Sequence, residues 1–316
     1  MLKKLYEAYD SNERLAAKLK AGRSGFDVVF PSSHFMAGQI KGGVLKKLDK
    51  SRLTNWQSLD PRLLDATAVN DPGNEYGFPY AWGTTGIGYN VEKVRAILGS
   101  DQPLDSWELI FNPDILAKLS TQGVAVVDSA PEMLSIALHY LGLPHHSTQV
   151  GDYKKAENLL RQMRRHVSYF HASKYAADLA RGDVCLVVGF SGDVLEAAKS
   201  ASEAGNGVQI EYVVPREGVP TWFDMVAIPT DAPNEDASYA FMNYLLRPAV
   251  LASVANAVDY ANGRSAADVV SERALKTAGG IYPSPEVFER LYAMEAIPPN
   301  VARLRARIWK GVMTGK

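Results

Sequence analysis

Short apolar runs alternate with longer amphipathic stretches along most of the chain. The runs at 26–30, 124–128 and 183–189 have the length and composition of buried strands. Stretches such as "KKAENLLRQMRRH" and "DVLEAAKSASEAG" have the composition and apolar spacing of helices. Strands that alternate with helices in this order are typical of α/β folds with mainly parallel strands. The pattern therefore predicts an α/β protein.

Three of the predicted strands end on small polar residues that open a helix. The junctions read "FPSS" at 30–33, "VDS" at 127–129 and "GFSGD" at 189–193. In open α/β sheets, ligands bind just outside the carboxyl ends of strands. Helix starts at that edge also offer unpaired backbone N–H groups. The sequence thus predicts three loops that line one pocket, without naming the ligand.

The junction at 189–193 also resembles the serine turn of a hydrolase. That turn reads G-x-S-x-G, and its last glycine keeps a strained turn clear of side chains. Here Ser191 is followed by Gly192 and then Asp193, so a side chain stands where none fits. A catalytic histidine would have to follow the serine, yet the last histidine of the chain is His171. The hydrolase interpretation fails on both counts.

Composition and the remaining motifs exclude further classes. A net charge of -1 favours neither nucleic acid nor a membrane surface as a partner, and no apolar run approaches the roughly 18 residues of a spanning helix. Cys185 is the only cysteine and is predicted to be a buried apolar residue. The spacing of His139, His145 and His146 matches no zinc pattern, so solvated histidines are expected. "GTTGIG" at 83–88 lacks the context of a dinucleotide fingerprint and is interpreted as a flexible interdomain crossing.

What remains is a set of acids near aromatic residues. Each acid alone is explained by the preference of carboxylates for first helical turns, and each ring alone by the core. Together they suit an organic ammonium, because carboxylates pair with its charge and ring faces attract it. Helix dipoles are expected to keep these carboxylates ionised. The set comprises Glu132, Phe190, Asp193, Trp222, Asp224 and Tyr260.

These residues lie in segments that resemble the periplasmic polyamine-binding proteins of bacterial ABC importers, most closely the putrescine-binding members. The resemblance covers almost the whole chain, in order, through "FDVVFPSSHF", "YAWGTTGIGYNVEKV", "YFHASKYAADLARGDVCLVVGFSGDV", "FDMVAIP" and "GIYPSPEVFERL". It implies a two-lobed type II periplasmic-binding-protein fold, each lobe a mainly parallel sheet flanked by helices. Lobe 1 would comprise residues 1–83 and 221–265, and lobe 2 residues 84–220 and 266–316.

The same resemblance implies a role for each site residue. A pocket serine and one carboxylate would contact the ligand, two further carboxylates would hold an ammonium group at the opposite end, and three rings would line the methylene chain. Position 190 holds phenylalanine where relatives usually have tryptophan, which changes one wall of the implied pocket. The pocket serine is Ser32 and the first carboxylate is Glu132. The two carboxylates at the opposite end are Asp193 and Asp224, and the three rings are Phe190, Trp222 and Tyr260.

The implied function is capture of putrescine, or of cadaverine, spermidine or agmatine, between the lobes. A monomer in the periplasm would deliver it to a membrane ABC permease, with no chemistry, cofactor, metal or nucleic acid involved. Two alternatives stay open: a truncated remnant that no longer binds, and the ligand-sensing domain of a regulator. The second would need a DNA-binding or signalling segment, and the sequence has no helix-turn-helix or basic patch.

The N-terminus departs from the family pattern. Relatives begin with a secretion signal, a first strand and a loop that reads Trp-Ser-Asp-Tyr or close to it. Here residues 5–9, "LYEAY", align with the second strand, and no signal peptide precedes them. The resemblance therefore implies either that the sequence is a fragment or that the protein is truncated within its site.

Overall fold

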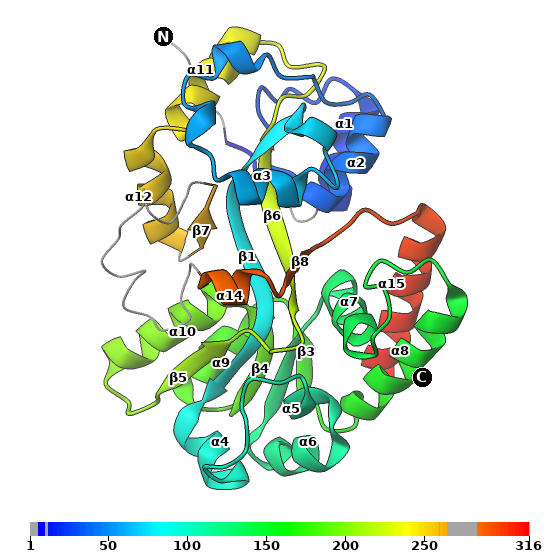
Figure 1. Cartoon of the computed structure of the whole chain (residues 1–316), viewed down its shortest axis with the longest axis vertical. Coiled ribbons are helices and arrows are strands. Elements are labelled where there is room, and N and C mark those ends of the chain that lie inside the picture. The colour runs from blue at the N-terminus through cyan, green and yellow to red at the C-terminus, as the bar shows by residue number, and fades with distance from the viewer. Residues whose placement is uncertain (1–5, 10–11, 259, 264–282, 316) are drawn as a thin grey trace. The chain divides into compact units, whose positions relative to one another are not determined.

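The computed structural model describes residues 6–9, 12–258, 260–263 and 283–315 of the 316-residue chain (Figure 1). Contacts divide the chain into two units, each with its own hydrophobic core. Unit 1 comprises Met1–Trp82, Trp222–Val254 and Asn262–Val269, and unit 2 comprises Gly83–Thr221, Ala255–Ala261 and Val270–Lys316. The domain boundary expected at 265–266 lies outside the described residues, and the expected domain limits stay a prediction.

Unit 1 packs helices around the first part of β1 (Gly77–Asn90) and the last part of β6 (Val219–Ala227). Leu15 and Leu19, one turn apart on α1, are both buried, and Met36 of α2 is fully buried. The core also includes Phe78 and Met242. The elements are α1 (Asn12–Ala21), α2 (Ser33–Lys41), α3 (Pro61–Thr67), α11 (Glu235–Leu245), the start of α12 (Pro248–Val258), and the short 3-10 turns Lys50–Arg52, Trp56–Ser58 and Pro72–Asn74.

The strand predicted at 26–30 is reduced to a single antiparallel bridge between Val29 and Ala227. These two residues exchange both backbone hydrogen bonds, and Met225 then donates to the carbonyl of Pro31. Proline has no N–H group, so Pro31 cannot return a hydrogen bond to Met225, and the pairing continues only as a second isolated bridge, between Ser32 and Asp224. Residues 6–9, where the alignment places a strand, also have no regular secondary structure.

Unit 2 is built on a mixed sheet with the strand order β3-β2-β4-β1, and β5 also pairs with β1. The pairs β2–β3 and β2–β4 are parallel, whereas β1 runs antiparallel to β4 and β5. The expected α/β class is confirmed, although β1 makes the sheet mixed. The strands are β1 (Gly77–Asn90), β2 (Val124–Val127), β3 (Tyr169–His171), β4 (Leu186–Phe190), β5 (Ile210–Val213), β6 (Val219–Ala227), β7 (Ala261–Asn262) and β8 (Leu291–Ala293).

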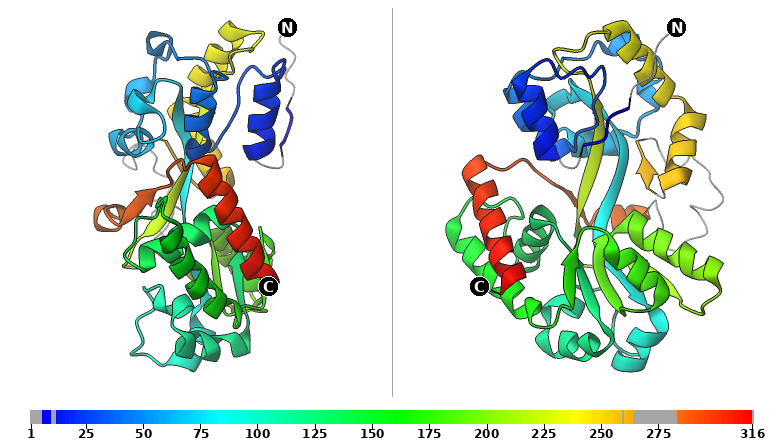
Figure 2. Two further views of the ribbon diagram at one scale, coloured as in Figure 1. Left: turned by 90° about the vertical axis from the view of Figure 1, so that its right-hand side faces the viewer. Right: turned by 180° about the vertical axis from the view of Figure 1, so that it is seen from behind.

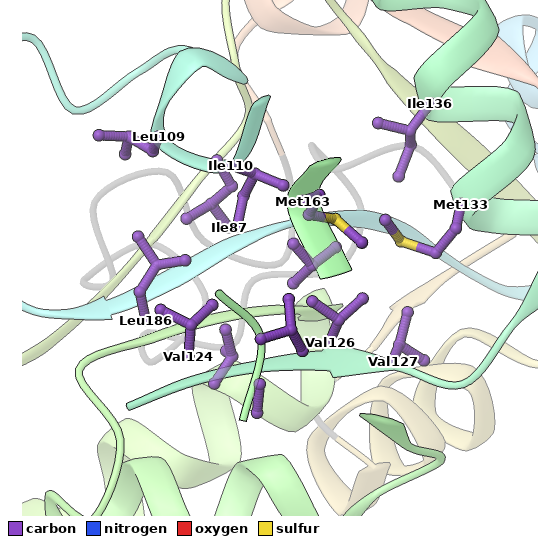
Figure 3. Close-up of a cluster of buried hydrophobic side chains, with 14 of the residues drawn as sticks. Ile87, Leu109, Ile110, Val124, Val126, Val127, Met133, Ile136, Met163 and Leu186 are labelled. Atoms are coloured by element: carbon purple, nitrogen blue, oxygen red, sulfur yellow. The ribbon is translucent and has the colours of Figure 1, made fainter. Parts of the chain in front are cut away.

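The core of unit 2 is apolar on the strands and on the helices that cover them. Figure 3 shows Ile87 of β1, Val126 of β2 and Leu186 of β4 together with Met133 and Met163 from two helices. Each of these side chains is at most 2% exposed. Cys185 is fully buried as expected, and its thiol donates to the carbonyl of Leu119 at 3.3 Å.

Two groups of helices flank this sheet. α9 and α10 pack on each other and against β4, and α10 also contacts β5. The second group consists of α7, α8 and α15, in which α15 packs against the other two helices (Figure 2). None of the helices in the described ranges is long and apolar enough to cross a membrane. The helices are α4 (Val91–Leu98), α5 (Glu108–Phe111), α6 (Pro113–Leu119), α7 (Ala130–Tyr140), α8 (Val150–Arg164), α9 (Lys174–Arg181), α10 (Ser191–Ala204), α14 (Pro285–Phe288) and α15 (Pro299–Thr314), with a 3-10 turn at Ser120–Gln122.

The glycines of "GTTGIG" have a different role from the one expected. Residues 83–88 lie within the long strand β1. A β-carbon on Gly86 would come within 2.6 Å of the Tyr212 hydroxyl, and one on Gly88 within 2.6 Å of a methyl of Val194. The segment is extended as predicted, but these two glycines are required by close packing.

Candidate functional site

The junction between β4 and α10 is built around two glycines that admit two tyrosine rings. β4 ends at Phe190 and α10 begins at the next residue (Figure 1). A β-carbon on Gly189 would lie 2.4 Å from the ring of Tyr175, and one on Gly192 would lie 2.4 Å from the ring of Tyr260. The glycines that suggested a hydrolase turn therefore make room for aromatic side chains.

Both tyrosines bind the carboxylate of Asp193, which lies in the first turn of α10. The Tyr175 hydroxyl donates to Oδ2 at 2.5 Å, and the Tyr260 hydroxyl donates to Oδ1 at 2.9 Å. Burial and the charge of Asp193 raise the pKa of both tyrosines, so their hydroxyls stay protonated donors. The partly buried ring of Phe190 packs against the core of unit 2. The structure thus brings together Phe190, Asp193 and Tyr260.

Ser191 is not placed as a nucleophile. Its side chain is buried, and its oxygen accepts a hydrogen bond from the backbone N–H of Thr84 at 3.3 Å. The serine therefore joins α10 to β1 at this junction.

Glu132, in the first turn of α7, is 5% exposed. Burial raises the pKa of its carboxyl to about 7, while the Thr85 hydroxyl and the charge of Arg305 act in the opposite direction. Its Oε2 atom has no hydrogen-bond partner among the described residues. Burial thus acts against the ionised form of Glu132, which the helix dipole was expected to favour.

Tyr212 interacts electrostatically both with Glu132 and with Tyr260, one of the two tyrosines that bind Asp193. Its hydroxyl is 2.7 Å from Oγ1 of Thr84. Burial raises the pKa of both Tyr212 and Tyr260; the charge of Glu132 adds to the shift of Tyr212, and Tyr212 adds to that of Tyr260. Unit 2 therefore holds two shielded carboxylates with tyrosine side chains near both.

Unit 1 holds the third carboxylate, Asp224 of β6. The Ser32 hydroxyl donates to Oδ1 of Asp224 at 2.9 Å, and the two residues also form an isolated antiparallel bridge. Asn12 supports the serine, because its Nδ2 donates to Ser32 Oγ at 3.0 Å and its Oδ1 accepts from the Ser32 N–H at 2.9 Å. Burial raises the pKa of Asp224 to about 6, against the opposing effect of the Ser32 hydrogen bond.

Aromatic side chains surround this carboxylate as well. Trp222 and Asp224 alternate with buried Phe223 along β6, so they share one face of the strand. On the opposite face, Phe223 stacks on Trp82 with ring centroids 6.2 Å apart. The charge of Asp224 contributes to the raised pKa of Tyr80. It also contributes to the raised pKa of Tyr9, about 12, so all three aromatics lie near the carboxylate.

The structure distributes the predicted residues over two clusters. Ser32, Trp222 and Asp224 lie in unit 1, and Glu132, Phe190, Asp193 and Tyr260 lie in unit 2. Four supporting residues were not predicted from the sequence, because an isolated tyrosine indicates no more than a core position and an isolated asparagine no more than the start of a helix. These are Tyr9, Asn12, Tyr80 and Tyr175.

Comparison with known proteins decides the family. A family model described as bacterial extracellular solute-binding protein matches residues 4–277. The chain belongs to this family. This solute-binding protein is 46% identical over 315 residues to the putrescine-binding periplasmic protein SpuD of Pseudomonas aeruginosa, an alignment that covers 100% of the chain and 86% of the relative. It is 45% identical over 316 residues to the putrescine-binding periplasmic protein PotF of Escherichia coli, with 100% and 85% covered.

A solved structure agrees with the sequence relatives. The solute-binding protein superposes with a TM-score of 0.82 on a putative spermidine/putrescine ABC transporter protein from Listeria monocytogenes. The two are 28% identical, and the match covers 99% of this chain and 91% of the other. The expected family, fold class and solute-binding role are confirmed, and the protein is not an enzyme.

A surface hollow of about 340 Å³ lies elsewhere, between α8 and α15 of the solute-binding protein. It contains none of the carboxylates described above, and its floor mixes aliphatic and charged side chains. It does not share their chemistry. Its lining is Val150, Tyr153, Lys154, Glu157, Arg161, Leu304, Arg307, Ile308 and Gly311.

Proposed function

We propose that this solute-binding protein binds a polyamine, with putrescine as its main ligand. One observation supports the proposal most strongly. Glu132, Asp193 and Asp224 are buried or partly buried, and none of the three forms an ion pair with a lysine or arginine among the described residues. Shielded carboxylates without a cation are costly unless a cationic ligand joins them.

The surroundings of these acids favour an organic ammonium. Each ammonium group has three N–H donors and pairs with carboxylate oxygens. Tyrosine and tryptophan rings attract the positive charge and cover methylene groups. Asp193 accepts a hydrogen bond from Tyr260 and follows Phe190 by three positions, and Asp224 has Trp222 on the same strand face. The relatives named for putrescine binding support the same ligand class.

Raised carboxyl pKa values fit this role. A carboxyl group that is partly protonated near neutral pH without ligand ionises when a cation arrives, because the opposite charge lowers its pKa. Glu132 and Asp224, with pKa values of about 7 and 6, would release protons on binding. We further propose that the protein works as a monomer in the periplasm and hands its ligand to an ABC permease, and that its two compact units are the two lobes.

Isothermal titration calorimetry tests the ligand. Putrescine, cadaverine, spermidine and agmatine are titrated separately, and 1-aminobutane and 1,4-butanediol serve as matched controls of similar length. We expect one-to-one binding of putrescine in the micromolar range, about -8 kcal/mol, and far weaker binding of both controls. Absence of heat with all four polyamines would overturn the proposal and favour a remnant that no longer binds.

A further inference from the structure

A second group of polar side chains lies in unit 2, away from the carboxylates described above. It joins the loop that follows α7 to the segment that follows β8. His145 and His146 come from the loop, and Glu295 comes from the segment. His146 is exposed, whereas His145 and Glu295 are partly buried. The solvation expected for the histidines is therefore found only at His146.

Three side-chain atoms of this group lie within 3.5 Å of one another. Nδ1 of His146 is 3.4 Å from Nε2 of His145 and 3.1 Å from Oε1 of Glu295. The third edge, from Nε2 of His145 to Oε1 of Glu295, is 3.5 Å. One ring nitrogen can donate to the other across this contact, but a cation shared by both nitrogens and the carboxylate would satisfy all three atoms at once.

The size of this triangle matches tetrahedral coordination. Ligands about 2.0–2.1 Å from a tetrahedral zinc ion lie about 3.3–3.4 Å from one another. Neighbouring ligands of an octahedral ion at the same bond length lie only about 2.8–3.0 Å apart. The observed edges of 3.1, 3.4 and 3.5 Å fit the tetrahedral case. We propose that His145, His146 and Glu295 bind a zinc ion, with a water molecule as the fourth ligand.

The surroundings of His145 hold its imidazole in place. The ring hydrogen-bonds to the backbone of Ala293, a contact of the kind that orients metal-binding histidines. It also packs on the ring of Tyr292, with centroids 4.4 Å apart. Arg305 fixes the loop, because its Nη2 donates to the His145 carbonyl at 2.6 Å.

His139 lies nearby but is occupied. Its Nε2 donates to the carbonyl of Glu217 at 2.5 Å, and its ring centroid is 6.4 Å from that of His145. The site therefore has two imidazoles and one carboxylate, a set that zinc accepts with an open fourth position. A bound ion would tie the loop after α7 to the segment after β8 and stabilise unit 2 by mass action.

The test uses full-length protein without a histidine tag, freed of metal with a chelator. Titration with zinc chloride should show one site of micromolar or tighter affinity, and cobalt(II) should give the intense visible absorption of tetrahedral coordination. His146→Ala and Glu295→Gln should each weaken zinc binding by about 100-fold or more. His166→Ala, which changes a histidine of another segment, should leave it unchanged.

Folding is checked separately, because His146 is exposed and its loss should not disturb the core. Circular dichroism should be the same for the wild type and His146→Ala, and added zinc should raise the Tm of the wild type alone. Equal zinc affinity in the wild type and both ligand variants would overturn the proposal, as would a wild type that takes up no zinc. Putrescine binding is measured in parallel and should not change in His146→Ala, so this test is independent of the proposed function.

Discussion

Tyr175 donates a 2.5 Å hydrogen bond to Asp193, and the ring that carries this hydroxyl fills the space that a β-carbon at position 189 would need. Tyr260 has the same relationship to position 192 and donates to the other oxygen of the carboxylate. Two glycines therefore allow two rings to hold one acid. The position of Asp193 therefore depends on the absence of β-carbons at positions 189 and 192.

Replacement of Gly192 by alanine should move the ring of Tyr260 and weaken putrescine binding by roughly 10-fold. The added methyl group would meet ring carbons 2.4 Å away, and overpacking of this kind also costs about 1–3 kcal/mol of stability. Gly151→Ala is the matched control, since it adds the same atom on helix α8 with open space around it. Calorimetry and thermal unfolding measure both effects. Unchanged affinity in Gly192→Ala would show that Tyr260 does not position the ligand.

Asp224→Asn should remove one of the charges that we propose bind the ligand. Loss of one partner of a buried charge pair costs about 2–5 kcal/mol, which is a loss in affinity of roughly 30-fold to several thousand-fold. The amide keeps the size of the side chain and can still accept the hydrogen bond from Ser32, so folding should be preserved. Asp101→Asn, at an exposed position, controls for the change in net charge. Equal affinity in both variants contradicts the assignment of Asp224.

Putrescine affinity should fall as the pH drops from 8 to 5. Burial raises the pKa of Glu132 to about 7 and that of Asp224 to about 6, so both carboxyls take up protons across this range and lose their attraction for ammonium groups. Calorimetry in buffers of different ionisation enthalpy should detect proton release on binding near pH 6.5. Glu132→Gln should flatten the pH dependence in the upper half of the range. A pH-independent affinity for the wild type would argue against both acids as ligands.

The same raised pKa values give the ligand-free protein a stability that declines with pH. Between the unfolded pKa of about 4.3 and the folded pKa of about 7, the folded state retains a proton on Glu132 that the unfolded chain has lost. This contribution is complete at acid pH and disappears as the pH rises through 7. His145, with its lowered pKa, acts in the opposite direction.

A difference between variants isolates the contribution of Glu132. Relative to the wild type, Glu132→Gln should gain stability as the pH rises from 5 to 8, by on the order of 1–3 kcal/mol. Urea unfolding at several pH values measures it without ligand. A constant difference across the range would mean that Glu132 titrates normally.

The acids of the proposed site could be picked out from the sequence because each follows or lies on a recognisable strand. Asp193 comes directly after the apolar run of β4, and Asp224 lies on the alternating strand β6. Their supports could not be predicted in this way. Tyr175 belongs to α9, where its pattern is that of any core aromatic, and Asn12 reaches Ser32 across 20 positions.

Glycines and prolines show a second limit of sequence reasoning. A glycine in a strand is consistent with flexibility or with close packing, and only the neighbours of Gly86 and Gly88 decide for packing. Likewise the apolar run at 26–30 has strand composition, but in the structure its Val29 forms only an isolated bridge with Ala227, and Pro31 has no N–H group to donate to Met225. Three-dimensional partners, which a single sequence does not contain, determine both outcomes.

The burial of Cys185 has a practical consequence for measurements on this protein. It is the only cysteine of the chain, it is fully buried, and burial raises the pKa of its thiol to about 11. Thiolates are the species that react with maleimide dyes, so this thiol should remain unlabelled in the folded protein. A single cysteine introduced on the surface would then carry all of the fluorophore. If the proposed polyamine ligand binds, this sequence can serve directly as the starting point for a fluorescent sensor of it, without removal of Cys185.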